Sequence, residues 1–454
     1  MMRIKYSTHF SGVGAFEQAM SRMNFESENI QACDPDYFTR LTFIWNYGTN
    51  EDWSLANTPE HKYFATEITK IVYGKSKLSE SEQLKVRKQA NEFAKKFSFY
   101  YPFNVYDADI PKEPQDIFVS SPPCQSFSLA GKRLGKEDER GILFFNSLEF
   151  IRTNNPRYFI FENVKGLLSD DSGRTFDEWI YSLGGKSING TMSGLVPFEN
   201  SVPYHIYWKV LNSKDHGVPQ NRERVFIVGI RDDQDNNFSW PVEEPLTKRL
   251  KDVLESEVDP KYFLSEKAVK HLINHKEKHD NKGTRFGVEL KDEESIASTI
   301  RANGALCPTD NHLKISVKQI NPSKESGGKQ PYQGNRVYDS KGISPTISAQ
   351  NGGKTKGSIL TCIPVLTPDR PNKRQNGRRF KEDGDPSFTI TTQDRHGIFD
   401  GYQIRRLTPR ECFRLQDFPD SFDFSVVSDS QAYKQAGNSI TVRVLEKILL
   451  NLNL

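Results

Sequence analysis

Short apolar runs that alternate with helical stretches constrain the fold of this chain more than any other feature. The run "RIKYSTH" leads through a glycine turn into a helical stretch, and "IQACDPDYF" repeats the same order. Further runs, each bounded by turn residues, are "DIFVSSPP", "RYFIFENV" and "RVFIVGI". Alternating strands and helices predict an α/β fold with a parallel, doubly wound sheet.

The chain has 454 residues, which is more than one hydrophobic core usually organises. After about Asp232 the helical character gives way to Gly, Asn, Ser and Thr with short strand-like pieces. We therefore predict an α/β domain formed by residues 1–240 and 425–454, and a smaller β-rich domain formed by residues 241–424. Residues 48–105 form a charged, helical insertion whose role the sequence does not indicate.

The distribution of charge points to a polyanionic partner. The formal net charge is only +3, but residues 301–380 hold 14 Lys and Arg against 4 Asp and Glu. A basic segment in an otherwise acidic chain is typical of nucleic-acid binding, although any single basic cluster could be ordinary solvated surface.

Several classes of protein are disfavoured. No stretch approaches the length of a membrane span and no apolar signal region begins the chain, so we expect a cytoplasmic protein without a membrane partner. The five cysteines are scattered and form no C-x-x-C pair, which predicts reduced thiols and no metal site.

The first strand-to-helix turn, "FSGVGAFEQ", predicts a ligand that approaches the backbone at Gly12 and Gly14. Glu17 stands where a dinucleotide fingerprint requires a third glycine, and a carboxylate there would repel a pyrophosphate. Asp34 and Asp109 follow later strands, where carboxylates can accept hydrogen bonds from ribose hydroxyls. Each aspartate alone could be a helix cap, but the ordered set favours a nucleoside without phosphate, namely S-adenosylmethionine.

A second group of residues suggests covalent catalysis. Cys124, in "SSPPCQSFSLAGKR", lies just beyond a predicted strand, where ligands bind in open α/β sheets. Buried filler or a metal ligand are the alternatives for a lone cysteine. Glu162 ends another strand, and Arg222 and Arg224 of "QNRER" could supply positive charge. Individually, the glutamate could be a cap and the arginines surface residues.

These motifs, in this order, resemble those of the DNA cytosine-5 methyltransferase family. The resemblance covers nearly the whole chain and is carried by "FSGVGAF", "ACDPDYF", "SSPPCQSFSLAGKRLGKEDERGILFF", "FENVKG", "HGVPQNRERVFIVGIR", "RRLTPRECFRLQDFPDSF" and "YKQAGNSITVRVLEKI". It implies a Rossmann-like methyltransferase domain and a target-recognition domain over residues 241–424. Two positions depart from the family pattern: Ala15 replaces a glycine, and Asp34 replaces a glutamate.

The resemblance also implies roles for individual residues. Cys124 would add to C6 of a cytosine flipped out of duplex DNA, and Glu162 would bind its N3 edge. Arg224 would contact the cytosine, and Arg222 the backbone or the loop that follows Cys124. The residues expected to line the cofactor pocket are Phe10, Gly12, Gly14, Asp34, Asp109, Ile110, Pro123, Leu143, Asn438 and Ser439.

We accordingly expect a monomeric enzyme that methylates double-stranded DNA and is paired genetically with a restriction endonuclease. An RNA cytosine-5 methyltransferase on the same scaffold is one alternative. A catalytically idle DNA-binding regulator is another, but it would predict the loss of Cys124, Glu162 or the glycine turn, and all are present.

Overall fold

A computed structural model describes most of the α/β part of the chain and little of the predicted recognition domain. The described residues are 3–23, 25–122, 143–184, 187–189, 201–234, 237–262, 290–291, 294–300, 311–314, 365–366, 396–397, 404–452 and 454. Cys124 and Pro123 lie outside this set, as does almost all of the basic segment 301–380.

The chain divides into two compact units. Unit 1 contains residues 1–255, 296–306 and 408–454, and unit 2 contains residues 256–295 and 307–407. Residues 408–424, which we assigned to the recognition domain, thus fall within unit 1. The assignment of biological roles to the two units stays a prediction.

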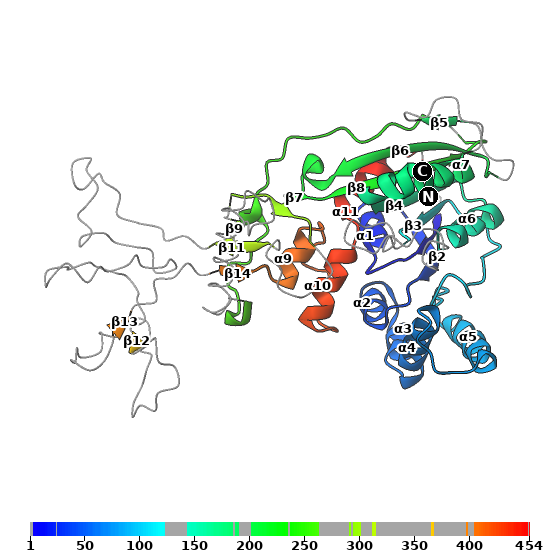
Figure 1. Cartoon of the computed structure of the whole chain (residues 1–454), viewed down its shortest axis with the longest axis horizontal. Coiled ribbons are helices and arrows are strands. Elements are labelled where there is room, and N and C mark those ends of the chain that lie inside the picture. Colours follow the sequence, from blue (N-terminus) through cyan, green and yellow to red (C-terminus); the bar gives the residue numbers. More distant parts are fainter. Residues whose placement is uncertain are drawn as a thin grey trace, which may run out of the picture. The chain divides into compact units, whose positions relative to one another are not determined.

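Unit 1 is built on a seven-stranded sheet with the strand order β2-β1-β3-β4-β8-β6-β5 (Figure 1). The strands β1 to β4 pair in parallel, and the carboxyl ends of β1, β2, β3 and β4 therefore lie at one edge of the sheet. The bounds are β1 (Ile4–His9), β2 (Ser27–Cys33), β3 (Ile117–Ser120), β4 (Tyr158–Val164), β5 (Ser187–Asn189), β6 (Tyr204–Asn212) and β8 (Glu223–Arg231).

The α/β class is confirmed, but the sheet is mixed rather than wholly parallel. Strand β8 runs antiparallel to both β4 and β6. The link from β6 to β8 is short and holds only the 3-10 turn η3 (Ser213–His216) and the two-residue strand β7 (Gln220–Asn221). Such a link can join antiparallel neighbours, whereas a parallel pair needs a longer crossover. The apolar run of β8 alone could not reveal this direction.

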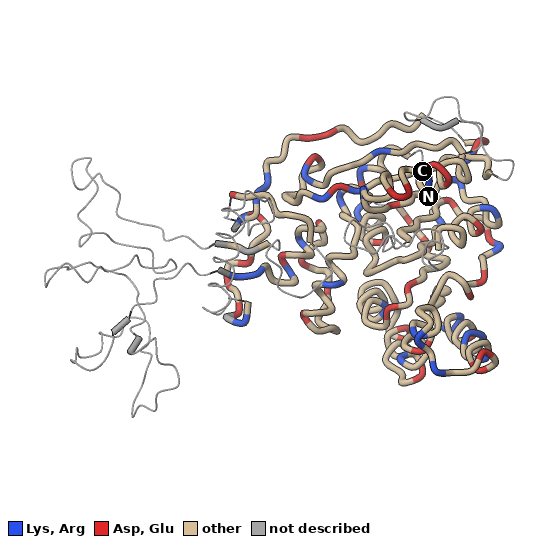
Figure 2. The backbone as a smooth tube through the Cα atoms, viewed as in Figure 1, with Lys and Arg blue, Asp and Glu red and all other residues tan. Residues whose placement is uncertain are grey.

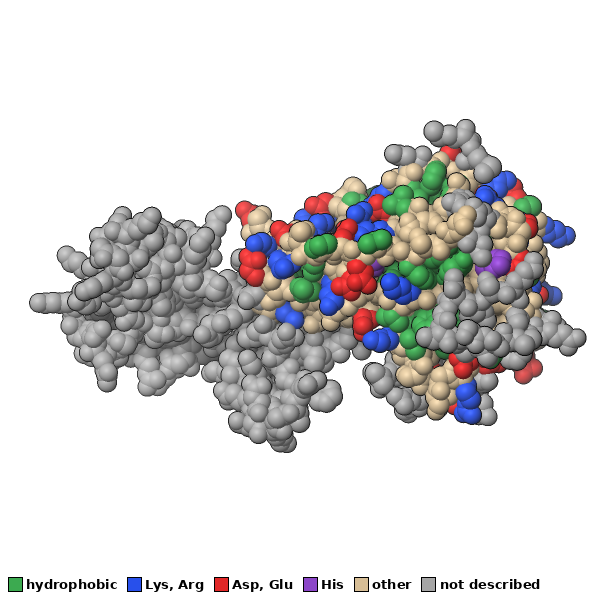
Figure 3. All heavy atoms as spheres, turned by 90° about the horizontal axis from the view of Figure 1, so that it is seen from above, with side chains coloured by type: hydrophobic (Ala, Val, Ile, Leu, Met, Phe, Trp, Pro, Cys, Tyr) green, Lys and Arg blue, Asp and Glu red, His purple; other side chains and the backbone are tan. Residues whose placement is uncertain are grey.

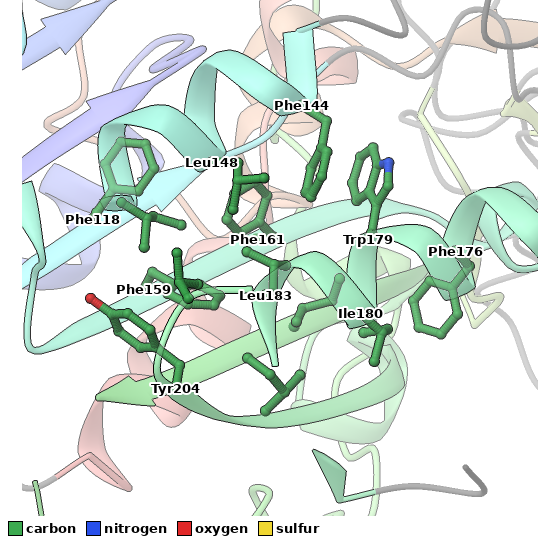
Figure 4. Close-up of a cluster of buried hydrophobic side chains, with 14 of the residues drawn as sticks. Phe118, Phe144, Leu148, Phe159, Phe161, Phe176, Trp179, Ile180, Leu183 and Tyr204 are labelled. Carbon is green, nitrogen blue, oxygen red and sulfur yellow. The ribbon is translucent and has the colours of Figure 1, made fainter. Parts of the chain in front are cut away.

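Helices α6 (Leu143–Asn154) and α7 (Arg174–Leu183) bury an aromatic-rich core against the sheet (Figure 4). Phe144 of α6 and Trp179 of α7 stack with their ring centroids 4.1 Å apart. Phe118 of β3 and Phe161 of β4 belong to the same cluster. This packing fixes the two central strands whose ends carry the predicted catalytic residues.

The insertion folds as a helical layer with α2 (Tyr37–Tyr47), visible as the blue helices in Figure 1. Its helices are α3 (Asn50–Ala56), α4 (Pro59–Val72) and α5 (Glu80–Ala94). Threonine or serine caps begin each of them: Thr49, Thr58 and Ser79 accept backbone N–H groups. The helical character predicted for residues 48–105 is confirmed between Asn50 and Ala94, whereas residues 95–105 form turns and irregular chain.

The remaining elements close unit 1 and begin unit 2. Helix α1 packs against α11, and β10 pairs with β7. In unit 2, β11 pairs with β9 and β14, and β12 pairs with β13. Their bounds are α1 (Ala15–Ser21), η2 (Lys165–Gly173), η4 (Leu250–Asp252), η5 (Pro260–Tyr262), β9 (Leu290–Lys291), β10 (Ala297–Ser298), β11 (His312–Lys314), β12 (Val365–Leu366), β13 (His396–Gly397), β14 (Ile404–Arg406), α9 (Pro409–Arg414), α10 (Asp429–Asn438) and α11 (Val442–Leu450).

Basic and acidic residues are interleaved along the described backbone (Figure 2). The face of the described residues seen in Figure 3 likewise mixes Lys and Arg with Asp and Glu. The basic excess of the sequence lies in residues 301–380, so its role as a polyanion footprint stays a prediction.

Candidate active site

The turn after β1 has an unusual backbone that exposes one glycine. Phe10, Gly12 and Gly14 all have positive φ, at 56°, 57° and 85°. A β-carbon on Gly12 would meet nothing within 4 Å, whereas one on Gly14 would lie 2.2 Å from the Tyr47 ring. Gly14 is therefore required by packing, and Gly12 faces open space.

Ser11 ties this turn to the end of β2. Its backbone N–H donates to the carbonyl of Cys33 over 3.0 Å, and the N–H of Cys33 donates to Ser11 Oγ over 2.8 Å. The glycine turn and the residue after Cys33 are consequently held side by side.

That next residue is Asp34, whose carboxylate faces the glycine turn. Oδ2 accepts the N–H of Gly12 over 3.1 Å, and Oδ1 accepts the N–H of Asp36 over 2.9 Å. Burial, reinforced by the nearby Asp36 carboxylate, raises the pKa of Asp34 to about 6. Each carboxylate oxygen has a second lone pair, so Asp34 can still accept hydrogen bonds from a ligand.

An apolar cluster lies next to Asp34. Leu143, at the start of α6, is packed with Cys33 and Val105, and Phe10 and Tyr106 lie against them, partly exposed. The structure thus brings together Phe10, Leu143 and the β2 end that carries Asp34, as the sequence predicts. Ile110 packs instead against the large aromatic core.

Asp109 is directed toward the insertion rather than toward this cluster. Its exposed carboxylate lies 2.9 Å from Lys95 Nζ and accepts a hydrogen bond from Asn91 Nδ2 over 3.2 Å. Both partners, from α5 and its end, contact Oδ2 of Asp109, and a cofactor role for Asp109 stays a prediction.

The second half of the candidate site is an ion pair across β4 and β8. Arg224 Nε lies 3.0 Å from Glu162 Oε1, and the two side chains are only 16% and 9% exposed. Val164, two residues after Glu162, is the register partner of Arg224, which puts both side chains on one face of the sheet. A carboxylate held in this way can accept a further hydrogen bond from a ligand at the strand end.

Asn163 connects this pair to the chain that leads to Cys124. Its Nδ2 donates to the carbonyl of Pro122 over 3.3 Å, and its Oδ1 accepts the N–H of Val164 over 2.8 Å. Asn163 is buried. The exit of β3 is therefore held against the end of β4, two residues before the predicted nucleophile.

Arg222 occupies a buried position of a different kind. Its guanidinium donates to the carbonyls of Ile300, Gly437 and Ser439, at distances from 2.8 to 3.3 Å. Burial lowers the pKa of Arg222 well below its usual range. These contacts join β10 and the end of α10 to β7, so its structural role is to hold the segments around the site.

Helix α10 carries Asn438 and leads to Ser439. Ser439 is buried and Asn438 is exposed. The helix is anchored to α2 through Lys434, whose Nζ lies 2.5 Å from Asp36 Oδ2. Gln435 adds a hydrogen bond from Nε2 to the carbonyl of Phe38 over 3.1 Å. The C-terminal motif is thereby placed beside the residues that follow Asp34.

Sequence reasoning missed the residues that hold the site together, namely Ser11, Asn163, Lys434 and Gln435. Each lies within a quoted motif, and an amide beside a predicted catalytic glutamate was a usable signal for Asn163. Lys434 carried no such signal, because its partner is nearly 400 residues away in the sequence.

Two predicted absences can be examined only in the described part of the chain. There, no cluster of three or more His, Cys, Asp or Glu could hold a metal ion. The helices described there also lack the length and apolarity needed to cross a bilayer.

Comparison with known proteins decides the family. The model of the C-5 cytosine-specific DNA methylase family matches residues 88–453, most of the chain. The chain belongs to this family. It is thus a DNA (cytosine-5) methyltransferase, with DNA as the substrate that the family implies.

Curated relatives agree with this placement. The chain is 33% identical to the orphan methyltransferase M.SPRI of Bacillus phage SPR, and the alignment covers 100% of this chain and 98% of that protein. It is 34% identical to the type II methyltransferase M.HpaII of Haemophilus parainfluenzae, over 73% of this chain and 70% of that one.

A solved structure supports the fold of this family member. The Dnmt2 methyltransferase of S. pombe matches over 100% of both chains with a TM-score of 0.52 and 14% sequence identity. At that identity the likeness concerns the fold alone, and it agrees with a Rossmann-like methyltransferase domain.

Proposed function

We propose that this chain transfers a methyl group from S-adenosylmethionine to C5 of a cytosine in double-stranded DNA, with Cys124 as the covalent nucleophile. The observation that carries the proposal is the buried Glu162–Arg224 pair at the end of β4, next to the β3 exit that Asn163 holds. A carboxylate and a guanidinium at this strand end, with a thiol that follows the β3 exit in the sequence, suit addition to a pyrimidine ring.

The cofactor proposal rests on residues of unit 1 that suit a nucleoside. Gly12 leaves open space, Asp34 has free acceptor capacity, and Phe10, Leu143 and Tyr106 offer apolar surface. Asn438 and Ser439 would complete the pocket from α10. When bound, S-adenosylmethionine supplies an electrophilic methyl group. The residues of the chain orient it by hydrogen bonds to the ribose and by apolar contact.

Each catalytic residue has a distinct task in this proposal. The Cys124 thiolate bonds to C6 of the flipped cytosine, while Glu162 donates a proton to N3 or holds one there. The electrons of the C5–C6 double bond thereby form an enamine across C4 and C5, the charge at N3 is neutralised by the proton, and the nucleophilic C5 takes the methyl group. Loss of the C5 proton to a base then expels Cys124 and restores the ring. Arg224 keeps Glu162 oriented and contacts the base, and Arg222 keeps the surrounding segments in place.

The biological setting is a further part of the proposal. We propose that methylation protects DNA from a nuclease that reads the same sequence. Four relatives matched over 100% of this chain are named orphan methyltransferases, and one with the same coverage is named a putative type II methyltransferase. Other type II names belong to relatives matched over about three quarters of this chain. This favours action without a paired endonuclease over the pairing that we expected from the sequence.

In the decisive experiment, the protein is expressed in a bacterial host whose DNA lacks cytosine methylation. The positions of 5-methylcytosine in the host DNA are then mapped. We expect methylation at one short sequence with the wild type and none with Cys124→Ser. Cys412→Ser, which alters a buried thiol in α9, is the matched control and should retain activity. Unmethylated DNA from a folded wild type would refute the function.

A second assay tests the covalent step and the nature of the polymer. A duplex with 5-fluorocytosine has no C5 proton to lose, so the wild type should form a covalent complex that Cys124→Ser does not form. The same assay with RNA of equal sequence tests the RNA alternative. Preferential trapping of RNA would replace DNA as the proposed substrate.

A further inference from the structure

Arg40 of α2 is a fully buried cation at the junction between the insertion and the candidate cofactor site. Its side chain is 0% exposed. It donates from Nη1 to the carbonyl of Asp34 over 3.2 Å and to that of Pro102 over 2.9 Å. Nη2 donates to the carbonyl of Tyr101 over 2.8 Å. One guanidinium thus joins the end of β2 to the end of the insertion.

A histidine from α4 completes the set of acceptors. Nε of Arg40 donates to Nε2 of His61 over 2.9 Å, and Nδ1 of His61 lies 2.9 Å from the carbonyl of Ala56. The second contact fixes the proton on Nδ1 and leaves Nε2 as an acceptor. Burial lowers the pKa of His61 to about 3, so the ring stays neutral.

Two aromatic rings flank the same guanidinium. Its central carbon lies 3.8 Å from the ring centroid of Tyr101 and 4.0 Å from that of Phe103. All four hydrogen-bond acceptors are neutral. Burying an arginine with neutral partners is costly, and the hydrogen bonds and ring faces offset part of that cost. An apolar residue at this position would leave all four acceptors without a donor, so the cation organises the segments that carry them.

The contact between Arg40 and Asp34 suggests a function for the buried cation at the candidate cofactor site. The carboxylate of Asp34 reaches Gly12 at the glycine turn, while its carbonyl is held by Arg40. The other three acceptors of Arg40 belong to His61, Tyr101 and Pro102, which all lie within the insertion, residues 48–105. On the opposite side, Lys434 holds Asp36. The short segment between β2 and α2 is therefore fixed from both sides.

We propose that Arg40 is a positioning residue for the cofactor, and that the insertion serves to hold it: His61, Tyr101 and Pro102 lock the guanidinium, which sets the Asp34 carboxylate at the distance that ribose hydroxyls require. This proposal rests on the proposed binding of S-adenosylmethionine. It gives the insertion, which the sequence left without a role, a part in cofactor affinity.

The test measures binding of S-adenosylmethionine by calorimetry, independently of methyl transfer, with thermal unfolding recorded for every variant. Arg40→Lys keeps the charge but cannot reach all four acceptors, so we expect a dissociation constant raised about tenfold and a kcat at saturating cofactor within about twofold of wild type. Arg22→Lys is the control. Arg22 is a half-buried arginine of the same unit that contacts Asp417 and Glu446, and its loss should lower stability without weakening binding.

A double-mutant cycle separates positioning from stability. If Arg40 acts through Asp34, Arg40→Lys should weaken binding about tenfold in the wild type and not further in Asp34→Ala. His61→Gln, which leaves Arg40 in place, should weaken binding in the same direction and serves if Arg40→Lys does not fold. Wild-type affinity in folded Arg40→Lys or His61→Gln, or fully additive effects in the cycle, would overturn the proposal.

The two proposals fail in different ways. If the wild type itself does not bind S-adenosylmethionine, the proposed function fails before the variants are compared. If the wild type binds and methylates but Arg40→Lys binds equally well, only the positioning role of Arg40 fails.

Discussion

Glu162 and Arg224 form a nearly buried ion pair across antiparallel strands, with Arg224 Nε 3.0 Å from Glu162 Oε1. Just beyond β4, Nζ of Lys165, the first residue of η2, lies 3.1 Å from Oε1 of Glu223, the first residue of β8, and the two side chains are 56% and 45% exposed. Glu162 and Glu223 are thus two glutamates in ion pairs at neighbouring positions, the first nearly buried and the second exposed. The first carboxylate can therefore be altered to test the reaction, and the second can be altered in the same way as a control.

Glu162→Gln should lower kcat about 100-fold or more while cofactor affinity stays near the wild-type value. The amide keeps the shape of the side chain but cannot supply a proton to N3, and general acid catalysis is typically worth ~10²–10⁴-fold. Single-turnover methylation of a duplex substrate measures the effect.

Glu223→Gln is the matched control for that variant. An exposed ion pair contributes little, and the Glu223 carbonyl that accepts Arg224 Nη1 is retained. We expect kcat within about twofold of wild type. A comparable loss in both variants would mean that the strand end as a whole, and not Glu162, supports the reaction.

Gly12→Ala and Gly14→Ala should separate cofactor binding from folding. Both glycines have positive φ, so alanine costs about 1–2 kcal/mol at either position. At Gly14 the added methyl also meets the Tyr47 ring, which adds about 1–3 kcal/mol of overpacking. Urea unfolding should show Gly14→Ala to be clearly the less stable variant.

The effect on S-adenosylmethionine binding should not follow the effect on stability in these two variants. The methyl group of Gly12→Ala enters open space beside Asp34, so it should weaken S-adenosylmethionine binding about tenfold in a protein that still folds. Unchanged affinity in Gly12→Ala would show that the cofactor lies away from this turn.

The fold could be predicted from the sequence where local pattern and packing agree. The first strand, the glycine turn and α1 follow directly from "RIKYSTHFSGVGAFEQAM", because the apolar period and the turn residues point to the same structure. The direction of β8 could not be predicted in this way, since a buried strand has the same apolar composition in either direction.

The candidate site shows a similar division. Glu162 and Arg224 could be placed together because each ends or begins an apolar strand in a quoted motif. Arg222 was grouped with them for its spacing, yet its contacts are the carbonyls of Ile300, Gly437 and Ser439. The contact of Lys434 with Asp36 depends on chain topology, which spacing along the sequence does not encode.

S-Adenosylmethionine binding should weaken as the pH falls through about 6. Burial raises the pKa of Asp34 to about 6, so its carboxyl is mostly ionised at pH 8 and mostly protonated at pH 5. Only the ionised form offers all its lone pairs to ribose hydroxyls. We expect affinity about tenfold lower at pH 5 than at pH 8, measured by calorimetry.

Asp34→Asn is the control for this pH dependence. The amide does not titrate, so its weaker binding should change little between pH 5 and pH 8 beyond the titration of the ligand itself. An equally steep dependence in the variant would assign the titration to another group.

Glu17→Gln should stabilise the protein, and more so at pH 8 than at pH 5. Glu17 is 5% exposed; its Oε1 accepts from Thr8 Oγ1 over 3.3 Å, and its Oε2 has no partner among the described residues. Burial raises its pKa from 4.5 to about 7. A carboxyl with a raised folded-state pKa contributes stability below pH 4.5, and this contribution is lost as the pH rises to about 7.

Glutamine removes that pH-dependent loss. The gain in unfolding free energy should be roughly 2 kcal/mol larger at pH 8 than at pH 5, because most of the shift lies within that interval. Urea unfolding at the two pH values measures it. Glu60→Gln, at an exposed first-turn position of α4, should show no such difference. Equal gains for Glu17→Gln at both pH values would mean that its carboxyl is already ionised in the folded protein at pH 5.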